Sequence, residues 1–258
     1  MTDLLEVSDV SRRFGGLNAL DGVSFRMPRN EIRGLIGPNG AGKSTLMNII
    51  CGHDRGATGS IHFNGDQIRG RRIHQIASLG IARVFQNPRV FPGLTVLQNV
   101  MVGCHTWSRS GFVRAITGLP AGRREEREIT AFAESLLEDL GLSPYALELP
   151  QNLAYGHQRM VEIARALASR PKLLLLDEPA AGLNPAETDR LKQLLLGLNA
   201  SGLALLLVEH NMDLVMSLCE TLTVLSFGRV IADGSPAEIR GNSDVIDVYL
   251  GSAPVVAA

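Results

Sequence analysis

Runs of apolar residues separated by polar turns predict alternating strands and helices along most of the chain. Short β-type segments come first, at residues 4–10, 23–27 and 32–36. Two later apolar runs, at residues 173–176 and 203–208, have the length of buried strands. They are far too short to cross a bilayer, so we expect no transmembrane segment.

The middle of the chain, residues 95–158, changes to a helical pattern. Apolar residues recur there with helical spacing, on one face of a predicted helix: Ile129, Phe132, Ala133, Leu136, Leu137 and Leu140. Beyond this insert, Asn184-Pro185-Ala186-Glu187 and Ser235-Pro236-Ala237-Glu238 each carry the N-cap, proline and glutamate of a helix start. The pattern indicates an α/β core interrupted by helices.

Composition and net charge indicate which classes of protein the chain can belong to. The 258 residues carry a formal net charge of −1, so no bulk field attracts the chain to nucleic acid or anionic lipid. Its three cysteines, an odd number without ligand-like spacing, favour reduced thiols over disulfides. The first residues show no basic and apolar pattern of a signal peptide. Only three of the 25 basic residues are lysines, which makes Lys43 conspicuous.

Lys43 belongs to a G-x-x-x-x-G-K-[ST] pattern that follows a predicted strand and opens a predicted helix. Glycines allow several backbone N–H groups to point at one phosphate chain, and the helix N-terminus adds partial positive charge. The lysine neutralises β/γ oxygens and the serine hydroxyl can ligate Mg²⁺. The alternative is a chance glycine-rich turn. The predicted nucleotide-binding residues are Gly37, Pro38, Asn39, Gly40, Ala41, Gly42, Lys43, Ser44 and Thr45.

A pair of carboxylates ends the apolar run at residues 173–176. With the phosphate loop, Asp177 would hold Mg²⁺ through water. Glu178 would face the γ-phosphate and orient or deprotonate the attacking water. Without that loop the pair would be a weak signal, because apolar strands often end in acids.

Further motifs narrow the family. The segment Leu153-Ala154-Tyr155-Gly156-His157-Gln158-Arg159 resembles the signature of ABC-transporter ATPases, usually Leu-Ser-Gly-Gly-Gln. The resemblance continues at Gln86 (the Q-loop position), at residues 181–184 (the D-loop) and at His210 (the switch histidine). The quoted motifs cover nearly the whole chain in the order typical of the family. Four segments, together with the insert at residues 105–128, resemble the ATPases of branched-chain amino acid importers: Phe14–Leu17, Arg83–Asn87, Asp177–Pro185 and Glu209–Met212.

The resemblance implies roles for single residues. Phe14 would stack on adenine; its alternative is a core phenylalanine near a strand end. Gln86 would sense Mg²⁺ and water and relay their state to residues 87–94, where relatives contact membrane subunits; its alternative is an exposed loop amide. His210 would bond the γ-phosphate, or be merely structural. The predicted catalytic residues are Glu178, His210, Gln86 and Lys43, and the predicted metal ligands are Ser44, Gln86 and Asp177.

The resemblance also implies a paired architecture, in which the signature completes the ATP site of a second subunit. The residues expected to act in trans are Leu153, Ala154, Tyr155, Gly156 and His157. Ala154 lacks the usual serine hydroxyl, Tyr155 replaces a glycine, and Asn184 replaces the D-loop aspartate. These departures predict a weaker site where this signature acts. We expect His157, where glutamine is common, to be an ordinary surface histidine.

The fold implied is a RecA-like P-loop NTPase core of an ABC ATPase, with an N-terminal antiparallel β subdomain and an inserted α-helical subdomain. One ABC domain is expected at residues 1–250, with the β subdomain and core at 1–94 and 159–250 and the helical subdomain at 95–158. Residues 251–258 are expected to be a flexible tail.

The function implied is ATP hydrolysis coupled to the uptake of branched-chain amino acids, with ATP and Mg²⁺ as cofactors. Expected partners are a second ATPase subunit, identical or different, two permease subunits and a periplasmic or lipid-anchored receptor. The chain would lie at the cytoplasmic face of the inner membrane. Importers of urea, amides or other solutes, exporter ATPases and nucleic-acid-linked ABC ATPases stay open, although the paired domains, coiled coils and basic tracts of the last class are missing.

Overall fold

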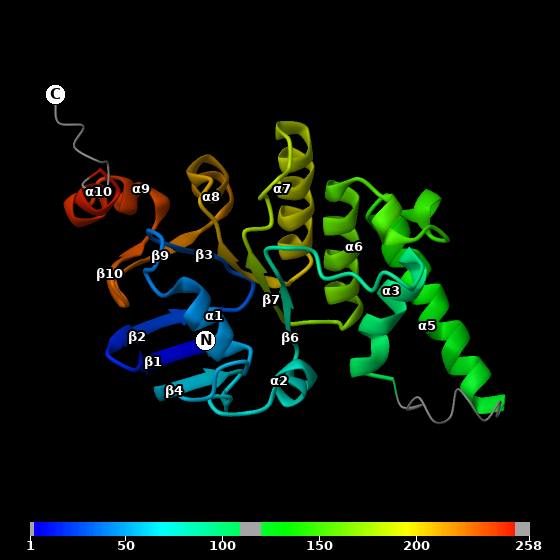
Figure 1. The fold of residues 1–258 in the computed structure, drawn as a ribbon, viewed down its shortest axis with the longest axis horizontal. Coiled ribbons are helices and arrows are strands. Elements are labelled where there is room, and N and C mark those ends of the chain that lie inside the picture. Colours follow the sequence, from blue (N-terminus) through cyan, green and yellow to red (C-terminus); the bar gives the residue numbers. More distant parts are fainter. Residues whose placement is uncertain (1–2, 109–119, 251–258) are drawn as a thin grey trace.

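The computed structural model describes residues 3–108 and 120–250, and these form two sheets flanked by helices (Figure 1). The predicted tail at 251–258 and part of the predicted insert, 109–119, lie outside the described residues. The first sheet is antiparallel in the order β2-β1-β4-β5. Its strands are β1 (Leu5–Phe14), β2 (Leu17–Met27), β4 (Thr58–Phe63) and β5 (Asp66–Gln67).

The second sheet is the α/β core and has the order β10-β9-β3-β8-β7-β6. Strands β9, β3, β8, β7 and β6 pair in parallel, and only the edge strand β10 is antiparallel. The strands are β3 (Ile32–Ile36), β6 (Ile81–Val84), β7 (Leu173–Asp177), β8 (Ala204–Val208), β9 (Thr221–Ser226) and β10 (Arg229–Gly234). The two apolar runs predicted as buried strands are therefore confirmed as β7 and β8.

Both faces of the parallel sheet are covered, which explains why β7 and β8 are apolar at every core position. Leu173 and Leu175 point into a core shared with α1 (Lys43–Ile50) and the antiparallel sheet. Leu174 and Leu176 point into the opposite core, beneath α7 (Pro185–Ala200) and α8 (Met212–Leu218). Figure 1 shows α1 and the antiparallel sheet on one side and α7 and α8 on the other.

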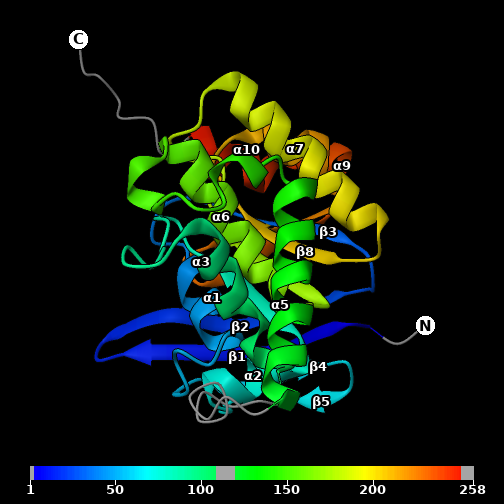
Figure 2. The ribbon, with the colours of Figure 1, turned by 90° about the vertical axis from the view of Figure 1, so that its right-hand side faces the viewer.

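Three helices form a separate cluster beside the parallel sheet, at the right of Figure 1 and in front in Figure 2. They are α3 (Val96–Gly103), α5 (Pro120–Asp139) and α6 (Tyr155–Ala168). A 3₁₀ turn at residues 104–106 follows α3, and two more, at 143–145 and 150–152, lie between α5 and α6. The three helices share one core, to which the predicted apolar face contributes Ala133 and Leu137. The predicted division at residue 158 falls inside α6, whose other face packs on the parallel sheet; the division itself stays a prediction.

The turn residues and helix caps adopt the conformations that their residue types favour. Asn64 and Gly65 both adopt positive φ, as a two-residue turn between β4 and β5 requires. The capping boxes at Asn184 and Ser235 form as predicted, at the starts of α7 and α9 (Pro236–Arg240). Two further helices of the described residues are α2 (Ile73–Leu79) and α10 (Ser243–Leu250).

Candidate active site at the carboxyl edge of the parallel sheet

Four neighbouring strands deliver the predicted site residues to one edge of the sheet. Strands β3, β8, β7 and β6 lie side by side in parallel, so their carboxyl ends share that edge. The loop of residues 37–42 follows β3, His210 follows β8, Glu178 follows β7 and Gln86 follows β6. This edge is where open α/β sheets bind ligands.

Glu178 is the centre of this group. Its Oε2 accepts a hydrogen bond from Nε2 of Gln86 at 2.6 Å. Its Oε1 lies 2.7 Å from Nε2 of His210. The structure thus brings together three residues that are 32 to 124 positions apart in the sequence, in the order that their strands occupy.

The backbone at Glu178 is held in an unfavourable conformation. Its φ is +47°, a left-handed value that a non-glycine residue rarely adopts. Its N–H donates to the carbonyl of Val208 at 2.8 Å, which fixes the turn against the neighbouring strand β8. Strain of this kind is typical of functional sites, where the surrounding structure over-determines one geometry.

The phosphate loop wraps around the start of α1. Gly37, Gly40 and Gly42 have φ values of +146°, +80° and +106°. An added Cβ would lie 2.1 Å from a backbone carbonyl at Gly37 and 2.6 Å from one at Gly42, so neither position tolerates a side chain. Lys43 extends back along the loop, and its Nζ donates to the carbonyls of Gly37 at 2.7 Å and Pro38 at 3.0 Å.

The charge of Lys43 is set by two opposing effects. Burial lowers the pKa of Lys43 below its usual value, and this effect is the largest. The negative charges of Glu178 and Asp177 act in the opposite direction. The lysine and the two acids are therefore near enough to interact across the site.

Asp177 has a partner that the sequence did not reveal. Its Oδ2 lies 2.6 Å from a guanidinium nitrogen of Arg83 in β6. The same guanidinium donates to Oδ1 of Asn48 in α1 at 2.7 Å. The strand pairing of β6 with β7 brings Arg83 beside Asp177, so only the strand order could have disclosed this contact.

Glu209 is a second neighbour of the site residues to which the sequence analysis assigned no role. It is 5% exposed, yet its carboxylate accepts hydrogen bonds from the backbone N–H groups of Ala180 at 2.8 Å and His210 at 3.1 Å. It therefore ties the turn after Glu178 to the histidine that contacts Glu178. The signal available was a charged residue directly after a fully apolar strand.

The C-terminal part of the chain also reaches the phosphate loop. The N–H of Gly228 donates to the carbonyl of Ala41 at 3.0 Å, so the turn between β9 and β10 braces the loop. Tyr249 of α10 forms a hydrogen bond with the backbone of Gly37 that lowers its pKa, although burial, the larger effect, raises the pKa of Tyr249 overall. Nothing in the sequence pointed to Tyr249 as a neighbour of the loop.

The predicted adenine-stacking residue, Phe14, ends β1 in the antiparallel sheet. It is 48% exposed, and the guanidinium of Arg12 lies 4.2 Å from the centre of its ring. The exposed ring is compatible with the predicted stacking and argues against a core phenylalanine.

The signature residues surround the start of α6. Leu153 is buried, and Ala154 is the N-cap residue with no side-chain hydrogen bond. A Cβ added at Gly156 would come within 2.6 Å of Oε1 of Glu187, so this position tolerates only glycine without a shift of that carboxylate. The ring of His157 lies 4.7 Å from that of Tyr145, centre to centre.

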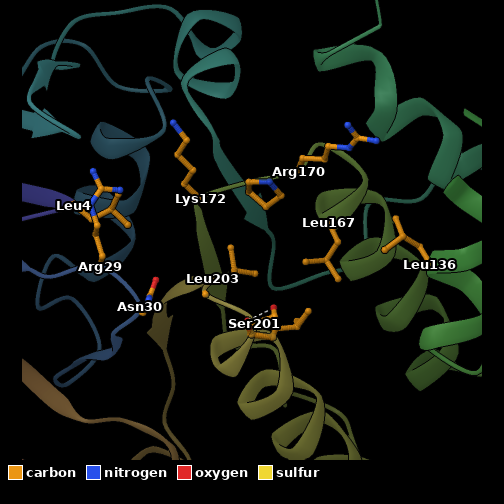
Figure 3. A pocket seen from close by; sticks show the side chains of 12 residues that line it. Leu4, Arg29, Asn30, Leu136, Leu167, Arg170, Lys172, Ser201 and Leu203 are labelled. Carbon is orange, nitrogen blue, oxygen red and sulfur yellow. Dashed lines mark hydrogen bonds between the residues drawn. The ribbon is translucent and has the colours of Figure 1, made fainter. Parts of the chain in front are cut away.

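A hollow of about 410 Å³ lies at the other edge of the sheet (Figure 3). Part of its lining comes from the segments that precede β7 and β8, including Arg170, Lys172, Ser201 and Leu203, and part from residues before β1 and β3 and from helices α5, α6 and α7. The site residues all follow the carboxyl ends of these strands, so the hollow is separate from the candidate active site. Its cationic side chains diverge in Figure 3 rather than converging on one point.

Known proteins match most of the chain. A family model described as ABC transporter matches residues 20–181, which include the phosphate loop, Gln86, the signature and both acids. The chain belongs to the ABC transporter family. As a member it is an ATPase that binds and hydrolyses ATP, within the predicted P-loop fold. A second model, described as branched-chain amino acid ATP-binding cassette transporter, matches residues 229–254 of this ABC protein.

Relatives of this ABC protein match over almost their whole length. The chain is 44% identical to the high-affinity branched-chain amino acid transport ATP-binding protein BraF of Pseudomonas aeruginosa, covering 97% of this chain and 98% of that protein. LivG of Escherichia coli, which has the same descriptive name, is 41% identical with equal coverage.

Solved structures of ABC ATP-binding cassettes have the same fold as this chain. A nucleotide-free ATP-binding cassette superposes with a TM-score of 0.84 at 30% identity, covering 96% of this chain and 99% of that one. The ADP conformation of MJ1267, an ATP-binding cassette of an ABC transporter, also gives 0.84, at 31% identity and with 97% and 100% covered. Within residues 3–108 and 120–250, every helix is too short or too polar to cross a bilayer.

Proposed function

We propose that this chain is the ATP-hydrolysing subunit of an importer for branched-chain amino acids. The observation that carries the solute assignment is the near-complete match to BraF and LivG, together with the match of residues 229–254 to a model of the same description. The solute itself would be selected by other subunits. The partners proposed are a second ATPase subunit, two permeases and an extracytoplasmic receptor, with this chain at the cytoplasmic membrane face.

The contacts of Glu178 support a role as the base or water-orienting group in ATP hydrolysis. One carboxylate oxygen faces Gln86 and the other faces His210, so the side chain is fixed in direction while remaining near the phosphate loop. A carboxylate held in this way can take a proton from water as the water attacks the γ-phosphorus. His210, whose side chain is 45% exposed, would bond a γ-phosphate oxygen.

Lys43 supports phosphate binding through its position and its charge. Its ammonium group lies against the carbonyls of Gly37 and Pro38, inside the curl of the loop. A triphosphate would replace these weak acceptors with charged oxygens, a stronger interaction. The first N–H groups of α1 point toward the same place and add the partial positive charge of a helix start.

The residues present fit a magnesium ion. Ser44, Gln86 and Asp177 supply hydroxyl, amide and carboxylate oxygens, which are the hard ligands that Mg²⁺ prefers. Oδ2 of Asp177 is held by Arg83, and this contact fixes the direction of the carboxylate. When bound with ATP, the ion would neutralise charge on the β- and γ-phosphate oxygens.

The exposed ring of Phe14 supports stacking on adenine.

The signature residues, from Leu153 to His157, would cap the phosphates bound by a second ATPase subunit. Helix α6 supports this role because its first turn, starting at Tyr155, is half exposed and presents backbone N–H groups.

Uptake of labelled solute tests the proposal. Membranes containing the permeases that co-purify with this chain, with the receptor and internal ATP, should accumulate leucine and not urea. Glu178→Gln should abolish that uptake, whereas the matched variant Glu134→Gln, at an exposed position on α5, should leave it unchanged. Uptake of urea or an amide in place of leucine would move the chain to a related importer. Salt-sensitive binding to DNA or RNA, without a permease, would contradict transport altogether.

A further inference from the structure

The first turn of α6 is bonded to the loop that carries Gln86. The hydroxyl of Tyr155 donates to the carbonyl of Gln86 at 3.4 Å and accepts from Arg159, one turn further along, at 3.2 Å. Arg159 is completely buried, and its two terminal nitrogens donate to the carbonyls of Phe85 and Gln86. Two residues of the signature helix therefore converge on one peptide carbonyl of the loop.

Glu162 holds the same loop from its other side. Its Oε2 lies 3.2 Å from Arg159, and its Oε1 accepts hydrogen bonds from the N–H groups of Phe85 and Arg89, both at 3.3 Å. Both carboxylate oxygens are thus occupied, and Glu162 is only 1% exposed. Because moving the loop away from the helix would leave the buried charges of Arg159 and Glu162 without these partners, the contacts tie the loop to the helix.

Tyr155 contributes a third contact through its ring. A Cβ added at Gly182 would come within 3.1 Å of its Cε1, so the ring lies against the backbone of the turn that follows Glu178. The ABC signature usually has a glycine at this position, which could make neither contact. Tyr155 therefore lies between the Gln86 loop and the turn after Glu178, and Gln86 itself bonds Glu178.

We infer that Tyr155 is a positioning residue that couples the two ATP sites of an ATPase pair, because it fixes the signature helix to the Gln86 loop of its own chain. Its hydroxyl bonds its own chain, so it is not aimed at the γ-phosphate of the second subunit. A shift of Gln86 in one site moves the signature that completes the other site. The inference rests on the proposed function, in which the signature acts in trans.

Steady-state ATP hydrolysis by the assembled transporter, measured against ATP concentration, tests the inference. Tyr155→Phe removes only the hydroxyl. We expect its Hill coefficient for ATP to fall toward 1 and its kcat to fall about two- to five-fold, while KM changes less than two-fold. Tyr155→Ala, which also removes the ring from Gly182, should lower kcat further. Tyr145→Phe removes a hydroxyl from the same helical cluster and should behave as wild type.

A purely structural role predicts a different result. It would lower the melting temperature or the active fraction of Tyr155→Phe and leave the Hill coefficient unchanged, which would overturn the inference. A wild-type Hill coefficient of 1 would overturn it equally. Glu178→Gln, assayed alongside, distinguishes failure of the coupling role from failure of the proposed function. If Glu178→Gln abolishes hydrolysis while Tyr155→Phe matches wild type, only the coupling role of Tyr155 fails. If Glu178→Gln retains turnover, the proposed function fails.

Discussion

Glu178 combines a reactive position with a strained backbone. The side chain lies between Gln86 and His210, and its backbone has a left-handed φ of +47°, which costs a glutamate free energy. The strain persists because the N–H of Glu178 and the flanking strands hold the turn. The strained backbone of Glu178 thus lowers the stability of the fold while the side chain is held between its two partners.

Replacement of Glu178 by asparagine should separate these two properties. Asparagine tolerates left-handed φ better than glutamate, so we expect Glu178→Asn to raise the free energy of unfolding by about 1 kcal/mol while abolishing hydrolysis. Glu178→Gln is the matched control, because it removes the same charge without a left-handed preference. Chemical denaturation of both variants measures the difference. Equal stability of the two would show that the backbone at 178 carries no strain.

The residues predicted from motifs and those missed differ in one physical respect. Lys43 and Glu178 follow the strands that position them, so local pattern located them. Arg83, Glu209 and Arg159 act through partners up to 94 positions away, and their contacts depend on which strands and helices become neighbours. Short-range sequence patterns do not contain that information.

Among the elements, α7 shows how a cap serves both fold and site. The Oδ1 of Asn184 accepts from the N–H of Glu187 at 2.9 Å, and Oε2 of Glu187 accepts from the N–H of Asn184 at 2.9 Å. Glu187 also lies against Gly156 at the start of α6. The capping box was predictable from sequence spacing, whereas its contact with the signature was not, since α6 and α7 meet only in the folded chain.

Loss of the Asn184 cap should lower the stability of the fold by a moderate amount. Asn184→Ala removes the acceptor for the N–H of Glu187 and should lower the free energy of unfolding by about 1 kcal/mol. Asn184→Asp keeps an acceptor and adds a negative charge at a helix N-terminus, so its stability should equal or exceed that of wild type. Thermal unfolding of the two variants checks this. An alanine variant as stable as wild type would mean that the cap is not formed in solution.

At the scale of the whole molecule, three hydrophobic cores enclose the three thiols, one in each core. Cys51 and Cys219 belong to the cores on opposite faces of the parallel sheet, and Cys104 belongs to the helical cluster. Burial, the largest effect in each case, raises the pKa of Cys51 and Cys104 to about 11 and that of Cys219 to about 12. The thiols are free, in agreement with the reduced state expected from the sequence.

These pKa values predict how stability depends on alkaline pH. Between a thiol's ordinary pKa near 9 and its raised value in the folded state, the folded protein keeps protons that the unfolded chain loses. The stabilising contribution is therefore complete below pH 9 and is lost as pH rises to 11 or 12. Denaturant titrations of wild type and Cys219→Ala should show a smaller decline for the variant over this range. Parallel declines would contradict the burial of Cys219.

The fold class was predictable because the α/β pattern, the helical insert and the motifs agreed. The sequence did not reveal that α10 returns to the phosphate loop, where Tyr249 bonds Gly37. That contact joins the last described helix to the loop after β3, and it forms only when the chain closes on itself. The carboxyl edge of the parallel sheet is thus built by segments from both ends of the chain.

The most direct test of the central claim, that Glu178 activates water at this edge, is the rate of ATP hydrolysis by Glu178→Gln assembled with its companion subunits. We predict that turnover falls by about 10²- to 10⁴-fold while Mg-ATP affinity stays within a few-fold of wild type. Glu134→Gln should match wild type in both measurements. Turnover of Glu178→Gln within two-fold of wild type would show that Glu178 does not activate the attacking water.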